Sequence, residues 1–207
     1  MTTPEFVFLL IAWAVAGGSP GPATLAIAGA AMTGGRAAGV VMAAGIQTGS
    51  AIWGLAAALG LSAVMLANVW LVEAMRYVGA AYLLFLAFKA ARSAIANKPL
   101  VPDAAARRSL SALYTRGLLI HLTNPKAIFA WGAIFAIVVP AGSDLSYVFE
   151  VFLALSVVSV LVFFGYALLF STPGFARAYA RARRWFEATF AVMFGYAGFK
   201  ILTAKLT

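Results

Sequence analysis

Long stretches without a charged residue constrain the fold of this chain more than any other feature. Positions 6–35, 37–72 and 151–176 contain no Asp, Glu, Lys or Arg. Each stretch exceeds the ~20 apolar residues that a helix needs to cross a bilayer. Of the 207 residues, 64% are hydrophobic and only 10% are charged, whereas an ordinary soluble domain carries about 25% charged residues. The composition therefore excludes a soluble enzyme, a disordered chain and a nucleic-acid-binding module.

Further spans are bounded or interrupted by polar residues. The segments between Arg76 and Lys89 and between Glu187 and Lys200 can cross a membrane if the flanking charges reach its two surfaces. The segment 113–141 is apolar except around Asn124 and Lys126. The first span exceeds the length of a signal peptide and no basic residue precedes it, so we expect it to be retained. The sequence thus predicts six transmembrane helices, at 5–31, 38–66, 70–91, 113–139, 145–171 and 186–204.

The net charge of +9 is distributed unevenly over the predicted loops. The first, third and fifth loops carry most of the basic residues, and the second and fourth carry almost none. Because cytoplasmic loops of membrane proteins are enriched in Lys and Arg, loops 1, 3 and 5 are predicted to be cytoplasmic and both termini to lie outside. The basic loop residues are Arg36 in the first loop, Arg92, Lys98, Arg107 and Arg108 in the third, and Arg177, Arg181, Arg183 and Arg184 in the fifth.

Two proline motifs interrupt predicted spans. Ser19-Pro20-Gly21-Pro22 lies within the first span, and His121-Leu122-Thr123-Asn124-Pro125-Lys126 lies within the fourth. Each proline removes a backbone donor and frees a carbonyl one turn upstream. Inside a membrane such a break is tolerated where it faces protein or a water-filled cavity. A simple proline kink is the alternative interpretation.

The spacing of the two motifs predicts an internal repeat. Pro20 and Pro125 lie about half a chain apart, and each half holds three predicted spans, so the second half would be inverted relative to the first. A shorter similarity, between residues 87–89 and 198–200, agrees with this spacing. We therefore expect an all-α integral membrane protein with a 3+3 inverted repeat and broken first and fourth helices. Residues 1–207 form one transmembrane domain, with halves at about 1–92 and 110–207 and a cytoplasmic loop at about 93–109.

The motifs resemble those of the LysE/RhtB family of amino-acid exporters. The resemblance rests on Pro20-Gly21-Pro22, the glycine series at positions 35, 39, 45 and 49, the segment 76–83 and Asn124-Pro125-Lys126. It covers nearly the whole chain. The resemblance implies a small exporter of amino acids or related metabolites in the bacterial inner (plasma) membrane, energised by the proton gradient.

A zwitterionic amino acid needs one site for its carboxylate and another for its ammonium group. After the first break, the N–H groups of residues 23–25 lack helical partners, and Thr24 adds a hydroxyl. Lys126 is predicted near mid-membrane, where an ammonium group costs about 2.5–3.5 kcal/mol. It would bind the substrate carboxylate, cap freed carbonyls or reach the membrane surface. The predicted binding residues at the breaks are Pro20, Gly21, Pro22, Thr24, Asn124, Pro125 and Lys126.

Three further interpretations concern polar side chains within the spans. Asn124 can satisfy carbonyls at the second break or contact the substrate. Gln47, in the second span, is included in the predicted binding site because it can face the cavity. His121 is the only histidine and is a candidate for proton handling. The alternative for His121 is an ordinary hydrogen bond within the bundle.

The absence of certain residue types restricts the class of substrate that the chain can bind. The chain has no cysteine and one histidine, so no metal site and no cofactor is expected. Some family members have aspartate at the position of Ser50, and no acid lies deep in a predicted span. A neutral zwitterion is therefore the expected substrate, and the coupling mechanism stays open.

The expected partners are the amino acid, protons and the bilayer, without nucleic acid; a homodimer is left open. The alternatives are an exporter of another small solute, such as an inorganic cation, and a scaffold subunit without transport.

Overall fold

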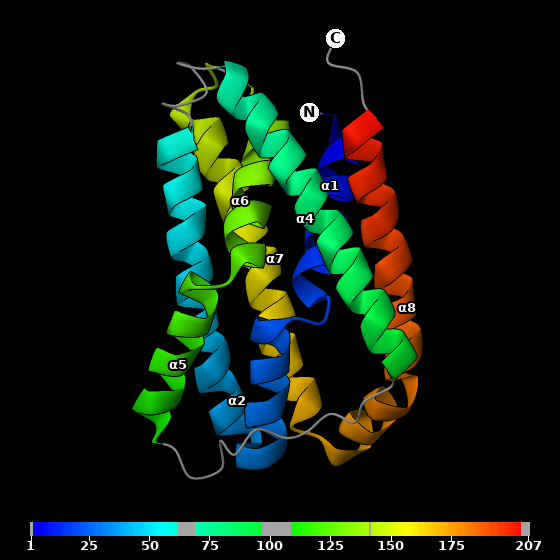
Figure 1. Ribbon diagram of the computed structural model, residues 1–207. Helices are drawn as coiled ribbons and strands as arrows, with labels where there is room; N and C mark the ends of the chain where they lie inside the picture. Colours follow the sequence, from blue (N-terminus) through cyan, green and yellow to red (C-terminus); the bar gives the residue numbers. More distant parts are fainter. Residues whose placement is uncertain (1, 62–68, 97–108, 141, 204–207) are drawn as a thin grey trace.

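The computed structural model describes residues 2–61, 69–96, 109–140 and 142–203. These residues are all-helical, as the sequence predicts, and form one elongated bundle (Figure 1). Within them there are seven α-helices and one π-helical turn: α1 (Thr3–Gly18), α2 (Pro22–Ala56), η1 (Ala57–Leu61), α4 (Val69–Ala96), α5 (Leu110–Leu122), α6 (Pro125–Val138), α7 (Leu145–Phe170) and α8 (Pro173–Thr203).

Both proline motifs break the helix that contains them, which confirms the prediction. The chain is extended at Ser19 and Gly21 between α1 and α2, and α2 begins at Pro22. Between α5 and α6 it is extended at Asn124, and α6 begins at Pro125, bent by 55° from α5. Proline suits the first position of a helix because the N–H that it lacks would have no helical partner there.

A sharp reversal at Gly35 separates the first two predicted spans. Gly35 has φ 75° and ψ −171°, a backbone conformation essentially restricted to glycine. A Cβ placed on Gly39 would lie 2.8 Å from the Cβ of Ala31, so the helical segments before and after Gly35 fold back on each other. The second segment continues into η1, while positions 62–66 of the predicted span 38–66 lie outside the described residues.

The predicted ends of two spans are wrong. The predicted span 186–204 is only the second half of α8, which begins at Pro173. The arginines assigned to the fifth loop therefore lie on α8. Likewise α4 extends to Ala96, past the predicted end at 91. Positions 97–108 of the predicted third loop, and 204, lie outside the described residues.

Apolar segments long enough for a membrane are present in the described part of the chain. Pro22–Gly60 and Leu145–Phe170 each meet the length and composition needed to cross a bilayer. The bent pair α5 and α6 forms a third segment of this kind, and α1 is a shorter apolar helix.

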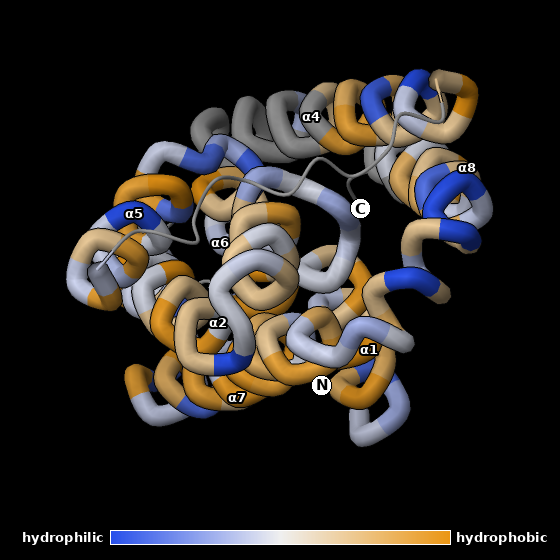
Figure 2. The backbone as a smooth tube through the Cα atoms, turned by 90° about the horizontal axis from the view of Figure 1, so that it is seen from below, coloured by the Kyte–Doolittle hydropathy of each residue, from blue (hydrophilic) through white to orange (hydrophobic). Residues whose placement is uncertain are grey.

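The helices pack in three main pairs. The reversed arms of α2 lie against α5 and α7, and α4 lies along α8. Viewed from below, the α4–α8 pair flanks one side of the bundle, and α6 lies near its centre (Figure 2). The start of α1 and the end of α8 lie at one end of the bundle (Figure 1). The reversal at Gly35, the start of α5 and the junction of α7 with α8 lie at the other end.

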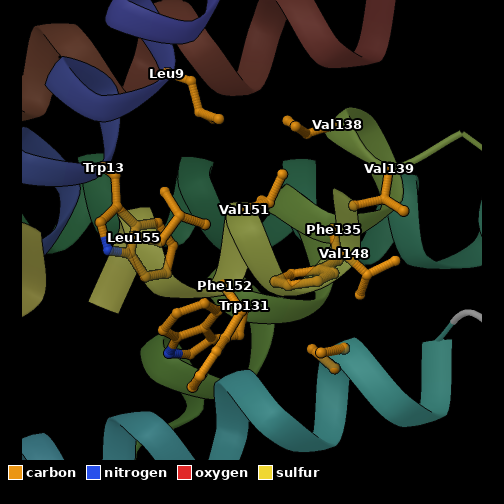
Figure 3. Close-up of a cluster of buried hydrophobic side chains, with 12 residues drawn as sticks. Leu9, Trp13, Trp131, Phe135, Val138, Val139, Val148, Val151, Phe152 and Leu155 are labelled. Carbon is orange, nitrogen blue, oxygen red and sulfur yellow. The ribbon is translucent and has the colours of Figure 1, made fainter. Parts of the chain in front are cut away.

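The largest core cluster joins α1, η1, α6 and α7. Figure 3 shows the two indoles of Trp13 and Trp131 within it, beside Phe135, Phe152 and several branched aliphatic side chains. Trp131 and Phe135 are each only 1% exposed. Since lipid is as apolar as these side chains, close packing rather than transfer from water is what favours their association inside a membrane. This cluster packs α1, which precedes the first break, against α6, which follows the second break.

Candidate functional site

The first break is stabilised by its own side chains. The Thr24 hydroxyl accepts the N–H of Gly21 at 3.0 Å and lies 3.2 Å from the carbonyl oxygen of Ser19, to which it can donate. Tyr166, on α7, donates its hydroxyl to the carbonyl of Gly18. Ser19 and Thr24 are fully buried. The backbone groups that Pro20 and Pro22 leave without helical partners are therefore bound by neighbouring side chains.

Lys126 connects the two breaks directly. Its ammonium group donates to the carbonyl oxygen of Ser19 at 3.2 Å and also binds the Ser19 hydroxyl. Its backbone N–H donates to the side-chain oxygen of Asn124 at 3.1 Å, so Asn124 caps α6. A Cβ on Gly21 would lie 3.7 Å from the Lys126 Nζ. One cation thus lies between two broken helices that are far apart in the sequence.

A small cavity lies at this junction. It encloses about 50 Å³, room for a few water molecules but not for an amino acid. The polar residues that line it are Ser19, Gly21, Thr24, Ser50, His121, Asn124, Lys126 and Ser159, and the apolar lining includes Trp13, Ala127, Trp131 and Phe163. The structure is therefore that of a closed site.

Two tryptophans form the wall of the cavity. Trp13 and Trp131 meet edge to face, with ring centroids 4.6 Å apart. Trp13 Nε1 donates to the Ser159 hydroxyl at 2.9 Å, and Trp131 Nε1 donates to the Ser50 hydroxyl at 3.1 Å. Both N–H groups are thus satisfied, and the indole rings present apolar surface to the cavity.

His121 contributes a polar atom that has no hydrogen-bond partner within the described residues. The side chain is 5% exposed, and its Nδ1 is buried without a donor or acceptor. Its ring packs edge to face against Phe163 at 5.6 Å, and its Cβ would lie 2.9 Å from a Cβ on Gly49. Buried polar atoms are usually paired, and this nitrogen can still form a hydrogen bond to a group in the cavity that His121 lines.

Comparison with known proteins identifies the family. The sequence pattern of the family described as "LysE type translocator" matches residues 15–205. The chain belongs to this family. Its members are transporters, which confirms that the protein is a membrane transporter and not an enzyme.

Several efflux proteins are related to this LysE-type chain. A threonine efflux protein of Escherichia coli (strain K12) is 28% identical over 194 residues, covering 90% of this chain and 92% of the relative. A leucine efflux protein of Klebsiella pneumoniae is 29% identical over 165 residues, covering 80% and 77%. An uncharacterized membrane protein of Pseudomonas aeruginosa is 31% identical over 196 residues, covering 91% and 90%. No solved structure matches the chain.

The structure brings most of the predicted site residues of this LysE-type protein together. Gly21, Thr24, Asn124, Lys126 and His121 line the cavity. The three prolines do not line it: Pro20 joins the two helices of the first break, and Pro22 and Pro125 begin α2 and α6. Gln47 is half-buried on α2 and is not among the lining residues, although its side-chain oxygen has no hydrogen-bond partner within the described residues.

Several residues of the site are absent from the sequence prediction. The side chains of Trp13, Ser19 and Ser159 lie in the cavity wall without having been predicted. Ser19 belongs to the proline motif, which is a usable signal, but nothing in the sequence pairs Trp13 with Ser159. Glu187, expected at the start of the predicted span 186–204, instead lies near the middle of α8 and is 4% exposed.

The junction offers chemistry for binding an anion. An ammonium group lies beside the N-terminus of α2, where the N–H groups of Ala23 and Thr24 occupy the first helical turn. The first turn of a helix attracts anions through such N–H groups and the helix dipole. Leu25 is not available for this purpose, since its N–H donates to the carbonyl of Gly21 at 2.9 Å. The described residues contain no group of three His, Cys, Asp or Glu that could hold a metal ion.

Proposed function

We propose that the protein exports neutral α-amino acids, or related small zwitterions, across the bacterial inner membrane and uses the proton gradient to do so. The observation that carries the proposal is the Lys126 ammonium group bound to Ser19 between the two broken helices. A cation at such a junction matches the carboxylate that all amino acids share. The names of the related efflux proteins support the same solute class.

The substrate carboxylate would replace Ser19 as the partner of Lys126. In the closed site the ammonium group is satisfied by a carbonyl and a hydroxyl, both weaker partners than a carboxylate. Ala23 and Thr24 of the first turn of α2 also line the cavity, and their N–H groups would bind the second carboxylate oxygen. Because the cavity of about 50 Å³ is too small for an amino acid, entry requires the helices around it to separate.

The lining of the site favours an uncharged substrate side chain. The wall is formed by Trp13, Trp131 and Phe163, and no carboxylate lines the cavity in the described part of the chain. A second ammonium group, as in lysine, would lie beside Lys126 with no carboxylate among the lining residues, at a cost of several kcal/mol in a medium of low dielectric constant. Threonine, leucine and homoserine fit this lining better than lysine.

The packing supports a six-span inverted repeat. In this interpretation the spans are α1 with the first arm of α2, the second arm of α2 with η1, α4, α5 with α6, α7, and α8. The first span of each half packs on the second span of the other half, and the third spans, α4 and α8, pair with each other. This reciprocity is expected of inverted repeats around a site at the midplane.

The proposed orientation rests on which elements share each end of the bundle. The reversal of α2, the start of α5 and the α7–α8 junction share one end of the bundle (Figure 1). Of the described basic residues of the predicted cytoplasmic loops, Arg36 follows the reversal at Gly35 and Arg177 lies near the start of α8. We place that end in the cytoplasm and both termini outside. Fusion of alkaline phosphatase and of green fluorescent protein to Thr207 tests the orientation: phosphatase activity is expected, and fluorescence would contradict it.

A flux assay tests the proposed function. Proteoliposomes are loaded with radiolabelled threonine, leucine, homoserine or lysine, and efflux is followed with an inward proton gradient. We expect the three neutral amino acids to leave faster than from protein-free liposomes, and lysine not to. Efflux of no amino acid would refute the proposal, and movement of an inorganic cation alone would favour a different solute class.

The Lys126→Met variant tests the site within the same assay. It keeps the aliphatic stem and removes the charge, so we expect amino-acid efflux to fall at least tenfold while the purified protein stays monodisperse. Arg177→Met removes an exposed cation from α8 and should leave efflux unchanged. Wild-type efflux in Lys126→Met would remove Lys126 from the site.

A further inference from the structure

A buried carboxylate lies outside the cavity lining described above. Glu187 is 4% exposed and lies 14 residues after the start of the 31-residue helix α8, roughly 21 Å along its axis. Glu5, Asp144 and Glu150 are exposed, so Glu187 is the only buried acid among the four acids whose burial the structure describes. An ionisable group buried within a membrane bundle is costly and is usually functional.

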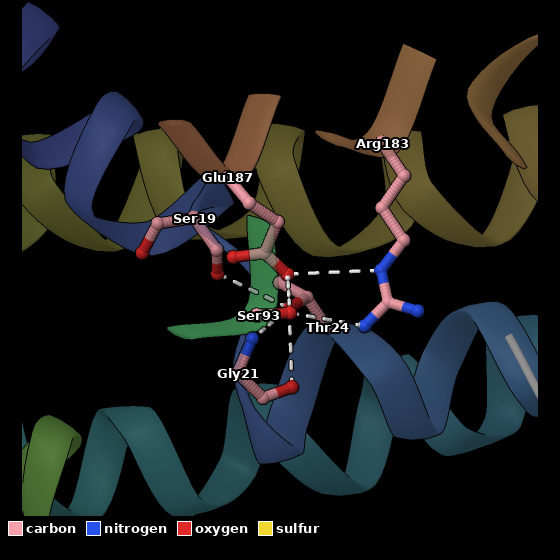
Figure 4. Close-up of polar contacts among 6 residues, drawn as sticks. All are labelled: Ser19, Gly21, Thr24, Ser93, Arg183 and Glu187. Atoms are coloured by element: carbon pink, nitrogen blue, oxygen red, sulfur yellow. Dashed lines mark hydrogen bonds and ion pairs between the residues drawn. The ribbon is translucent and has the colours of Figure 1, made fainter. Parts of the chain in front are cut away.

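Glu187 is held by polar partners on two helices. The Ser93 hydroxyl of α4 donates to its Oε1 at 3.0 Å, and Arg183 Nε lies 3.7 Å from the same oxygen. Arg183 also reaches the Ser93 oxygen at 3.4 Å. Figure 4 draws this cluster in the same view as Ser19, Gly21 and Thr24 of the first break. Ser93 can either donate or accept, so the same hydroxyl can remain bonded to Glu187 whether or not the carboxylate carries a proton.

The face of α8 that carries Glu187 also reaches the substrate site. Phe194 lies two helical turns beyond Glu187, and the Lys126 Nζ lies 6.0 Å from the centre of its ring. The acid and the ammonium group therefore lie along the same face of α8, although they come from different helices.

The charged groups around Glu187 are mostly cations. Arg183 lies on its own helix, Lys126 approaches the same face of α8 from α6, and Lys89 lies on α4. The other titratable neighbours are Tyr166 on α7 and Tyr179 on α8. The remaining charged residues of the packed helices include Arg92 on α4, Arg36 on α2 and Glu5 on α1, all of which are exposed. Glu187 thus carries the negative charge on the face of α8 that Lys126 approaches.

We propose that Glu187 is the proton-binding group that couples amino-acid export to proton entry. The inference rests on the proposed export function. When it is ionised, Glu187 supplies the negative charge that complements the ammonium group of the substrate, while Lys126 attracts the carboxylate of the substrate. A proton taken up from outside binds the Glu187 carboxylate and removes its negative charge. The protein therefore binds either the zwitterionic substrate or the proton, but not both at once. Release of the proton to the cytoplasm restores the charge and allows the next substrate to bind.

The coupling can be tested in proteoliposomes that contain the full chain. They are loaded with the neutral amino acid that the wild-type protein transports. For wild type we expect an inward gradient of one pH unit to accelerate efflux by up to about tenfold, the change in proton activity. Glu187→Gln preserves an acceptor for Ser93 but cannot take up a proton, so its efflux should be the same with and without the gradient. Glu150→Gln removes an exposed carboxylate from α7 and should respond as wild type does.

Two further variants separate proton binding from a structural role. Ser93→Ala removes a hydrogen bond but keeps the acid, so the response to the gradient should persist with a shifted pH midpoint. Glu187→Asp should behave likewise, and it tests the inference even if Glu187→Gln does not fold. A wild-type gradient response in Glu187→Gln, or a wild-type pH profile in Glu187→Asp, overturns the inference and leaves the export function standing. Absence of amino-acid efflux in wild type itself overturns both.

Discussion

Replacing Gly45 by alanine tests whether the close contact between α2 and α5 positions the site. A Cβ at Gly45 would lie 2.1 Å from the carbonyl oxygen of Tyr114, 2.9 Å from its carbonyl carbon and 3.0 Å from the backbone nitrogen of Leu118. The contact is reciprocal, since a Cβ at Gly117 of α5 would lie 2.5 Å from the carbonyl oxygen of Met42. Small residues allow helices to approach this closely inside membranes.

The cost of the substitution follows from these distances. All three contacted atoms belong to the helical backbone of α5, which cannot rotate aside as the end of a side chain can. The helix must retreat by about an ångström, and overpacking of this kind costs roughly 1–3 kcal/mol. For a chain of this length, each kcal/mol lowers the unfolding temperature by about 2–4 °C. Because His121 lies on α5, the displacement of α5 should also move His121 away from the cavity.

Thermal unfolding of the purified protein in detergent, followed by tryptophan fluorescence, measures the effect. Gly165→Ala is the matched control, since a Cβ there meets nothing within 4 Å. It should be neutral or stabilising by up to about 1 kcal/mol, because alanine favours a helix over glycine. The double variant Gly45→Ala/Gly117→Ala should cost less than the sum, since one displacement of α5 relieves both contacts. An unchanged unfolding temperature for Gly45→Ala would refute the reasoning.

Two further substitutions test local features of the fold by the same measurement. Gly35→Ala should destabilise by roughly 1–3 kcal/mol through backbone strain alone, because φ is 75° and nothing lies within 4 Å of the added Cβ; equality with Gly165→Ala would contradict the assigned reversal. Trp131→Phe should cost about 1–3 kcal/mol by removing the donor to Ser50 in a buried position. Trp185→Phe, at a side chain 74% exposed, should stay within about 0.5 kcal/mol of wild type.

The sequence predicts the parts of this protein that depend on local backbone chemistry. Prolines break a helix wherever they occur in its interior, so the motifs at 19–22 and 121–126 are enough to indicate both breaks. A lysine one residue after Pro125 must lie close to the second break for the same reason. The prediction that Lys126 either binds substrate or caps freed carbonyls stays open, although in the closed site it does contact the carbonyl of Ser19.

The features that the sequence does not predict depend on which face of a helix meets which neighbour. Glu187 is expected at a helix end because charges usually mark the ends of spans. It is instead buried because α8 is longer and because Ser93, 94 positions earlier, supplies a hydrogen bond. Trp13 and Ser159 are 146 positions apart, and their contact arises only when α1 packs on α7. Composition and periodicity contain no information about such pairs.

The bridge between Lys126 and Ser19 explains how a site for a charged group can close without substrate. A buried ammonium group without a partner would be strongly destabilising, and the Ser19 carbonyl and hydroxyl supply that partner in the closed site. Under the proposed function, binding is then an exchange of partners, in which the substrate carboxylate displaces Ser19. Part of the attraction is offset by the contact that is lost, so the affinity stays moderate. Moderate affinity suits an exporter, because the substrate must also leave on the outer side.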